Sequence, residues 1–154
     1  MVESFSLRGF KDLENALGEL GSAAGKRVAK RALKKSALPV RNKARQLAPK
    51  DENVLEDAIE ISTQLSKQAR NALGAEQDGI VRIFVGIDQA APQQVFIYAI
   101  VQEEGNEDTA AQPYFRPAWA MEGPEAIDIL GPELWADIER TAKRAARKRL
   151  KAKD

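Results

Sequence analysis

The longest helical pattern in the chain runs over residues 22–48 and carries one narrow apolar stripe. Its members recur every three or four residues: Leu33, Ala37, Val40, Ala44 and Leu47. Pro39 lies inside the pattern, and because proline removes a backbone donor and crowds the preceding turn, we expect a kink there. The sequence therefore predicts a long, kinked N-terminal helix that packs on the rest of the fold through one face.

The flank of this predicted helix is strongly basic. Residues 26–45 contain nine Lys and Arg and no Asp or Glu. Six of these bases gather beside the apolar stripe: Arg27, Arg31, Lys34, Lys35, Arg41 and Arg45. Such a face can be a solvated helix flank, a contact for phosphates, or a docking surface for an acidic protein. No aromatic residue lies among the bases, which argues against stacking of single-stranded bases on this face.

Charge is segregated along the whole chain. Residues 51–140 contain eighteen acids and only five bases, whereas residues 143–153 contain seven bases. The net charge of +1 hides this pattern, and a total so close to neutral gives little support to a dedicated DNA-binding protein. We therefore expect unlike surfaces to dock on one another, and we expect the basic tail, about residues 143–154, to be mobile until a partner orders it.

Alternation of apolar and polar residues predicts two half-buried strands, over residues 58–65 and 79–88, joined by a polar hairpin connection. A weaker alternation over residues 2–9 suggests another short strand. The apolar run 95–101 fits either a buried strand or a short buried helix, and we favour a strand. The segment 105–111 is acidic and rich in turn-forming residues, so we expect a loop.

Helical spacing also appears near both ends of the chain. Apolar residues from Phe10 to Leu20 predict a first helix that glycines end. Pro117 suits the start of a short helix ended by Gly123 and Pro124, and Pro132 suits the start of a last helix to about residue 150. The sequence thus predicts a single α+β domain over residues 1–154: an antiparallel sheet packed against a long kinked N-terminal helix, with a C-terminal helix.

Composition argues against several classes of function. The chain has no histidine and no cysteine, so the commonest general base and the usual nitrogen and sulfur metal ligands are missing. Four acids could hold a hard cation, namely Glu103, Glu104, Glu107 and Asp108, but they lack the ligand spacing of a Ca²⁺ loop. No signal peptide and no long apolar run is present. We expect a cytosolic product that is not an enzyme, with no cofactor, no metal and no membrane partner.

One stretch, residues 112–121, gathers three of the nine aromatic residues of the chain. Tyr114, Phe115 and Trp119 can close the core over the sheet, or they can seal against another subunit, where Tyr, Trp and Arg are enriched. We expect Phe115 to lie in the core, and Arg116 and Trp119 to lie at an interface. Arg116 is also expected to pair with a carboxylate, with Glu103 as the first candidate.

The neighbourhood of this stretch resembles a known phage protein family. The residues that carry the resemblance are Tyr98, Glu103, Gly105, Pro113, Phe115, Arg116, Pro117 and Ala118. They are similar to the motif of the gene-product-ten-like neck family of HK-ninety-seven-type long-tailed bacteriophages. The segment "ARQLAPKDENVLEDAIEI" and the "VGI" of residues 85–87 resemble other parts of the family, over residues 10–125 in all. This chain lacks the glycine that the family usually carries before the leucine of that segment.

The resemblance implies a structural virion protein. Such a protein forms a ring, usually a hexamer, that completes the tail, joins it to the head connector or stopper and leaves a channel for double-stranded DNA. It implies contact with a tail terminator or tail tube protein, and location in the virion after assembly in the host cytoplasm. The motif residues, with Trp119, would form an elbow presented to a neighbouring subunit. A tail terminator ring and a small DNA-binding protein remain the alternatives.

Overall fold

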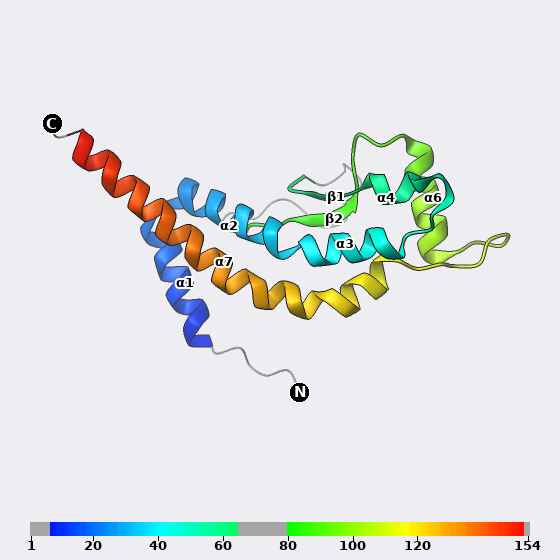
Figure 1. Cartoon of the computed structure of the whole chain (residues 1–154), viewed down its shortest axis with the longest axis horizontal. Helices are drawn as coiled ribbons and strands as arrows, with labels where there is room; N and C mark the ends of the chain where they lie inside the picture. The colour runs from blue at the N-terminus through cyan, green and yellow to red at the C-terminus, as the bar shows by residue number, and fades with distance from the viewer. Residues whose placement is uncertain (1–6, 65–79, 153–154) are drawn as a thin grey trace.

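The computed structural model describes residues 7–64 and 80–152. One long helix, α7 (Phe115–Lys151), runs along much of the molecule, and α2 (Ser22–Ser36) and α3 (Leu38–Leu47) lie along it (Figure 1). Helix α1 (Leu7–Glu19) packs on α2 and α7, and a small sheet lies against α3. The predicted α+β fold is confirmed, although helices account for most of it.

The predicted N-terminal helix is present and breaks where the proline predicts. Helices α2 and α3 meet at Ala37, and Pro39 lies in the first turn of α3. Backbone hydrogen bonds continue through the break, from the N–H of Ala37 to the carbonyl of Leu33 and from the N–H of Arg41 to the carbonyl of Ala37. Proline has no N–H to give, so the chain changes direction there while most of the ladder survives.

The sheet has two antiparallel strands, β1 (Ile59–Ser62) and β2 (Phe84–Ile87), in a register that pairs Ile59 with Ile87. Both are shorter than predicted. Strand β1 ends where the Ser62 hydroxyl accepts the N–H of Gln64 in a turn, and residues 80–83 are not part of β2. The predicted connection lies outside the described residues. The predicted strand over 2–9 is wrong for residues 7–9, which begin α1, and its remainder is not described.

Between α3 and the sheet, the chain forms a 3₁₀ turn η1 (Asp51–Asn53) and a short helix α4 (Val54–Ala58), which the sequence did not predict. Asn53 has a φ of 56°, in the left-handed region that glycine favours and that Asn tolerates better than most residues. It stands two positions before the buried Leu55. Asn53 thus provides a left-handed turn directly before α4.

The favoured strand over residues 95–101 is wrong: the segment belongs to helix α6 (Gln93–Glu104). The apolar run serves two faces of this helix. Ala99 is buried, with Val95 and Tyr98 packed beside it against the core, whereas Ile97 and Ile100 point outward. Pro92 precedes the helix and Gly105, with a φ of 76°, ends it. The run 95–101 is therefore continuously apolar because apolar residues occupy both the buried side and the exposed side of α6.

Both predicted C-terminal helical segments are present, but the predicted break between them is wrong, because α7 continues through Gly123, Pro124 and Pro132. Each proline costs a backbone hydrogen bond to the preceding turn. Packing holds the helix together, since Gly123 and Ala126 are buried and α7 packs on both α3 and α2. The helix follows a bent course along this contact (Figure 1). The predicted end near residue 150 is confirmed.

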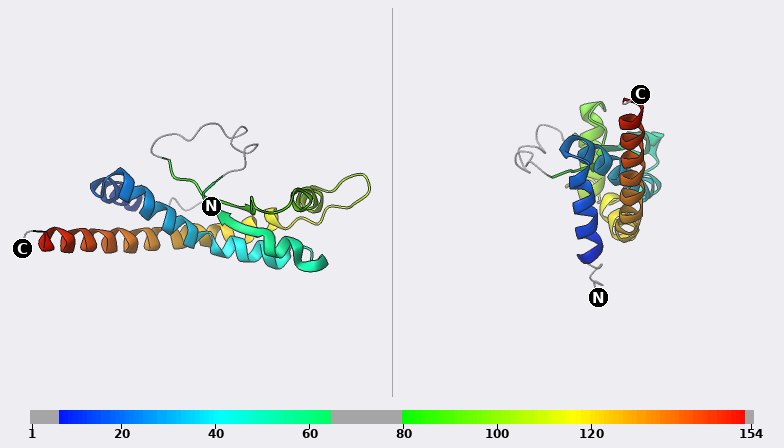
Figure 2. Two further views of the ribbon diagram at one scale, coloured as in Figure 1. Left: turned by 90° about the horizontal axis from the view of Figure 1, so that it is seen from above. Right: turned by 90° about the vertical axis from the view of Figure 1, so that its left-hand side faces the viewer.

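Two clusters of buried residues hold the molecule together. One surrounds Tyr114 and joins α3, α4, β1, α6 and the start of α7: Ala44, Ala48, Leu55, Ile59, Ala99, Tyr114 and Ala118. The other lies between α1, α2 and α7 and contains Val28, Ala32, Leu134 and Ile138. The view from above shows that α7 extends beyond the second cluster to the C-terminal end, while residues 105–113 reach out at the opposite end (Figure 2).

Candidate interaction site

The last turn of α6 and the first turn of α7 form a polar elbow built around Glu103. One carboxylate oxygen of Glu103 accepts the backbone N–H groups of Tyr114 and Phe115 at 2.8 and 2.9 Å. The other accepts the N–H of Arg116 at 3.0 Å and its Nε at 3.2 Å. A carboxylate at this position satisfies free N–H groups of α7 and interacts favourably with its dipole. Glu103 therefore fixes where α7 begins.

The turn that brings Glu103 to this position depends on Gly105. Its φ of 76° is unfavourable for other residues, and a Cβ there would lie 2.8 Å from the backbone nitrogen of Ala111. The side chain of Asn106 accepts the N–H groups of Asp108 and Thr109, which closes the loop. The N–H of Gln112 then donates to the carbonyl of Gln102 at 2.7 Å. The loop is thus held by hydrogen bonds at its base and within it.

The pKa of Glu103 reflects these contacts. Burial of the carboxyl by itself raises the pKa, but the three backbone N–H groups and the Arg116 side chain outweigh burial. The net result is a pKa below its ordinary value of 4.5, so Glu103 is ionised at neutral pH. The elbow is an electrostatic support for a helix end, and its groups are already satisfied by one another.

The aromatic residues of the elbow divide between core and surface. Tyr114 is fully buried, and its hydroxyl donates to the carbonyl of Ala99 at 3.3 Å. Burial, followed by the charge of Glu103 and the proximity of Tyr98, raises the pKa of Tyr114. Phe115 packs on Tyr114 in a tilted arrangement with ring centroids 4.7 Å apart, and it lies partly buried against the same cluster.

Tyr98 ties the elbow to the chain that follows α3. Its hydroxyl donates to Asp51 at 3.2 Å, and its ring packs against the Tyr114 cluster. Burial, the charge of Asp51 and this hydrogen bond raise the pKa of Tyr98. The phenol therefore stays protonated near neutral pH and acts as a hydrogen-bond donor.

Ala118 is buried, whereas the remaining motif residues are at least partly exposed. Pro113 is exposed and Pro117 is half-buried. The expected ion pair of Arg116 with Glu103 is confirmed, and Arg116 also donates to the carbonyl of Glu103 at 2.9 Å, yet 70% of its side chain is exposed. Trp119 is 62% exposed, and its indole lies over Gly123, where a Cβ would approach it to 3.5 Å. The elbow thus presents an arginine and a tryptophan to the outside.

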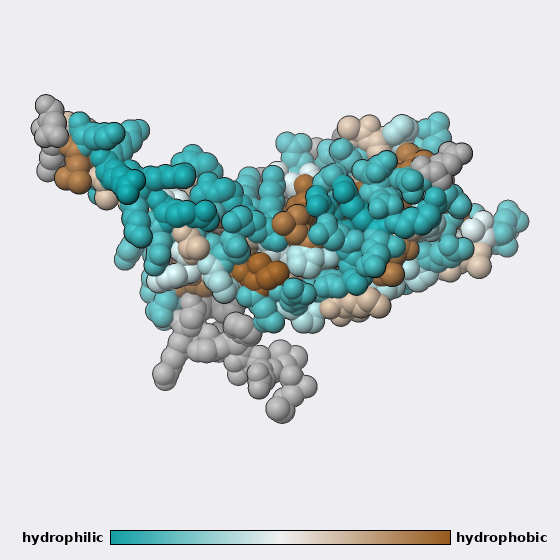
Figure 3. Space-filling view, viewed as in Figure 1, coloured by the Kyte–Doolittle hydropathy of each residue, from teal (hydrophilic) through white to brown (hydrophobic). Residues whose placement is uncertain are grey.

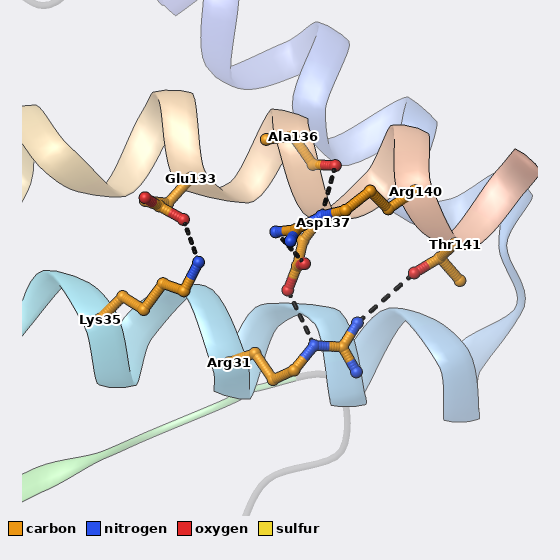
Figure 4. Close-up of polar contacts among 7 residues, drawn as sticks. All are labelled: Arg31, Lys35, Glu133, Ala136, Asp137, Arg140 and Thr141. Carbon is orange, nitrogen blue, oxygen red and sulfur yellow. Dashed lines mark hydrogen bonds and ion pairs between the residues drawn. The ribbon is translucent and has the colours of Figure 1, made fainter.

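The six bases that flank the apolar stripe of the N-terminal helix form the predicted basic docking face. Most of them pair with acids of the same chain. Arg31 donates to Asp137 at 2.8 Å and to Thr141 at 3.4 Å, and Lys35 pairs with Glu133 at 2.8 Å (Figure 4). Arg41 and Arg45 both pair with Glu60 of β1, and Arg45 also donates to the carbonyl of Ile59. Of these six bases, only Arg27 and Lys34 make no ion pair or side-chain hydrogen bond within the described residues.

The acids that receive these bases were not identified from the sequence. They are Glu60, Glu133 and Asp137, and a further pair joins Lys43 to Glu122 at 3.3 Å. A signal for two of them exists: Arg31 and Lys35 are four residues apart, as are Glu133 and Asp137. Two antiparallel helices bring such pairs opposite one another, because residues four apart share a helix face. The acidic middle of the chain therefore neutralises part of its own basic helix.

Neither a metal site nor a membrane-spanning helix is found in the described part of the chain. In residues 7–64 and 80–152 no three His, Cys, Asp or Glu side chains come close enough to hold a metal ion. Of the acids in residues 103–108, Glu104, Glu107 and Asp108 are exposed, whereas Glu103 caps the start of α7. Among the described helices, none combines the length and apolar character needed to cross a bilayer.

Comparison with known proteins gives one match. The model of the family described as "Bacteriophage HK97-gp10, putative tail-component" matches residues 11–105, which is more than half of the chain. The matched region contains Tyr98, Glu103 and Gly105 of the elbow and all six predicted bases, and it ends before Pro113. No curated protein and no solved structure matches the chain.

Proposed function

Because the chain belongs to the HK97-gp10-like family of bacteriophage tail components, we propose that it forms a ring in the neck of the virion. This ring completes the tail and joins it to the head connector or stopper around the DNA channel. The protein acts as a structural part of the virion rather than as an enzyme. The match over residues 11–105 carries this proposal, and the resemblance of residues 113–118 to the family's motif extends it.

The elbow supports a role in contact between subunits. Its inner groups, Glu103 and Tyr114, are satisfied within the chain, so they hold the start of α7 in one position. Its outer groups, Arg116 and Trp119, are exposed. Arg and Trp are among the residues that contribute most to protein interfaces when a partner buries them. A rigid elbow that exposes these two side chains suits a ring contact.

The ring would have about six subunits and further partners on both sides, namely the head connector or stopper and a tail terminator or tail tube protein. Double-stranded DNA would pass through its lumen. Assembly would take place in the host cytoplasm before the protein enters the virion. Of the predicted basic docking face, Arg27 and Lys34 are the exposed bases available for such contacts.

A tail terminator ring is the nearest alternative, and it shares the ring and the virion location. A small DNA-binding protein has less support. The predicted DNA-contacting helix uses Arg31, Lys35, Arg41 and Arg45 in ion pairs of its own chain, which lowers the positive potential available to phosphates.

Light scattering and native mass spectrometry of the purified protein, alone and mixed with isolated tails, test the proposal. We expect a closed oligomer of about six subunits in at least one of the two settings. A protein that stays monomeric in both settings would show that the ring is wrong. Electron microscopy of the mixture then separates the roles: binding at the head-proximal end of completed tails supports tail completion, and capping of a bare tube supports a terminator.

A further inference from the structure

The bases of α7 beyond its contact with α1 and α2 have no partner in the described chain. We call residues 142–151 the arm. It carries Lys143, Arg144, Arg147, Lys148, Arg149 and Lys151 and no acid, and every one of its residues is exposed. Basic residues of α2 and α3 find acids on α7 or β1, but within the described residues none of the arm's bases makes an ion pair. The arm projects past the body and its surface is mostly hydrophilic (Figure 3).

The arm is amphipathic. Ala142, Ala145, Ala146 and Leu150 recur at the spacing of one helix face, and four of the six bases lie on the other side. Leu150 is 68% exposed. The apolar face adjoins the one that Leu134 and Ile138 bury against α2. A helix that needed only to contact phosphates would have no use for this apolar side.

The opposite end of the molecule has the complementary character. We call Ile97, Ile100, Glu104, Glu107 and Asp108 the acidic end. The first three lie on one face of α6, because they are three and four residues apart. Ile97 and Ile100 are 55% and 59% exposed, and no described base pairs with the three acids. Two views place this end and the arm at opposite extremities, so they cannot meet within one chain (Figures 1 and 2).

We propose that the arm of one copy packs on the acidic end of the next copy, with its alanines and Leu150 on Ile97 and Ile100 and its bases beside Glu104, Glu107 and Asp108. This contact joins unlike surfaces, so it is heterologous, and repeated with the right rotation it closes a ring. The inference rests on the proposed ring and names the surfaces that build it. Apolar burial supplies attraction, while the opposite charges set orientation and exclude arm-to-arm pairing.

Cross-linking tests the contact without background, because the chain contains no cysteine. Ile100→Cys and Leu150→Cys proteins are mixed and treated with a short bismaleimide. We expect cross-linked dimers in the mixture and none with either variant alone, since each cysteine would face an unmodified neighbour. A variant with both cysteines should give a ladder whose last band counts the subunits. Leu38→Cys mixed with Leu150→Cys is the control, expected to give no cross-link.

Charge exchange tests the same contact. Arg147→Glu with Lys148→Glu should weaken self-association at least about tenfold, and adding Glu104→Lys with Glu107→Lys to those copies should restore much of it. Lys11→Glu with Lys30→Glu, also exposed bases, should leave association unchanged. Circular dichroism confirms that each variant is folded.

The outcomes separate this inference from the ring itself. Rings seen by light scattering without the Ile100–Leu150 cross-link would overturn the contact and leave the ring standing. A cross-link in Leu150→Cys alone would replace it with arm-to-arm pairing. Monomers under all conditions, with tails included, would remove both proposals. Loss of binding to a random DNA duplex at about 0.15 M salt in the arm variant, with association unchanged, would assign the arm to DNA.

Discussion

The two ends of α7 belong to one helix but have different surroundings. The first part begins at a carboxylate cap, packs on α3 and α2, and places Glu122, Glu133 and Asp137 opposite bases of those helices. The arm packs on nothing that the structure describes and keeps its charges unpaired. The same backbone geometry thus supports a packed helix with paired acids at one end and an exposed helix with unpaired bases at the other.

This difference shows what a block of like charges does and does not indicate. The basic residues of α2 and α3 and those of the arm look equivalent in the sequence. Among the residues that the structure describes, only the first set meets acids of its own chain, because α7 returns antiparallel beside it. A charged block becomes a candidate for partner binding when the fold leaves it without acids, and here that applies to the arm.

The largest effect on the buried end should come from Glu103→Ala. The change removes the acceptor for three backbone N–H groups at the start of α7, in a side chain that is only 14% exposed. We expect the free energy of unfolding to fall by about 2–3 kcal/mol. Denaturant titration measures it. Glu104→Ala, the exposed neighbour, is the matched control and should have almost no effect.

Arg116→Ala sharpens the same comparison. A partly buried pair of this kind can contribute about 3 kcal/mol. Because 70% of the Arg116 side chain is exposed, the structure lowers this expectation to about 1 kcal/mol or less. If Arg116→Ala cost as much as Glu103→Ala, the backbone cap would not be the main role of Glu103.

After Glu103→Ala, Asp137→Ala should cause the next largest loss in the free energy of unfolding. Its carboxylate is 8% exposed and pairs with Arg31 at 2.8 Å and Arg140 at 2.6 Å. Since both arginines are about half exposed and can regain water, we expect a loss of about 1–2 kcal/mol, below the cost of stranding a buried charge. Chemical unfolding of Asp137→Ala beside Arg27→Ala, whose base has no such pair, measures the difference. Equal stabilities would mean that this ion pair contributes nothing.

The stability difference between the wild type and Glu103→Gln should depend on pH. Because the pKa of Glu103 is lower in the folded protein, its charge stabilises the fold above the ordinary pKa of 4.5, and that contribution is lost as pH falls through the folded pKa. We therefore expect the wild type to be more stable than Glu103→Gln at neutral pH and the gap to narrow on acidification below about pH 5. A gap that stays constant from neutral pH to pH 3 would contradict the lowered pKa.

Local patterns predicted much of this molecule. Pro39 marked the break between α2 and α3, alternation marked both strands, and Glu103 was paired correctly with Arg116. The failures arose where tertiary packing decided the outcome. Pro124 and Pro132 lie inside α7 because burial against α3 and α2 compensates for the lost hydrogen bonds, and no window of sequence around a proline contains that information.

The candidate site shows the same limit. The sequence identified the residues of the elbow, but it could not show that Glu103 caps α7 with three backbone contacts, since the cap depends on the turn at Gly105. It also assigned docking to all six bases of the N-terminal helix. Four of them pair inside the chain, because the order of helices in space, which brings α7 back beside α2, was not predictable from charge alone.

The smallest effect on stability should come from the arm. Arg147→Glu with Lys148→Glu changes exposed residues that pack on no described element, so the free energy of unfolding of the monomer should change by less than about 0.5 kcal/mol. Relief of repulsion among the arm's bases even favours a slight gain in helix content. Denaturant titration at a protein concentration low enough to keep the chain monomeric measures it. A clear loss of stability would mean that the arm packs on its own chain, and the contrast between the two ends of α7 would then be wrong. An unchanged monomer with weakened assembly would assign the arm's bases to a contact made only between molecules.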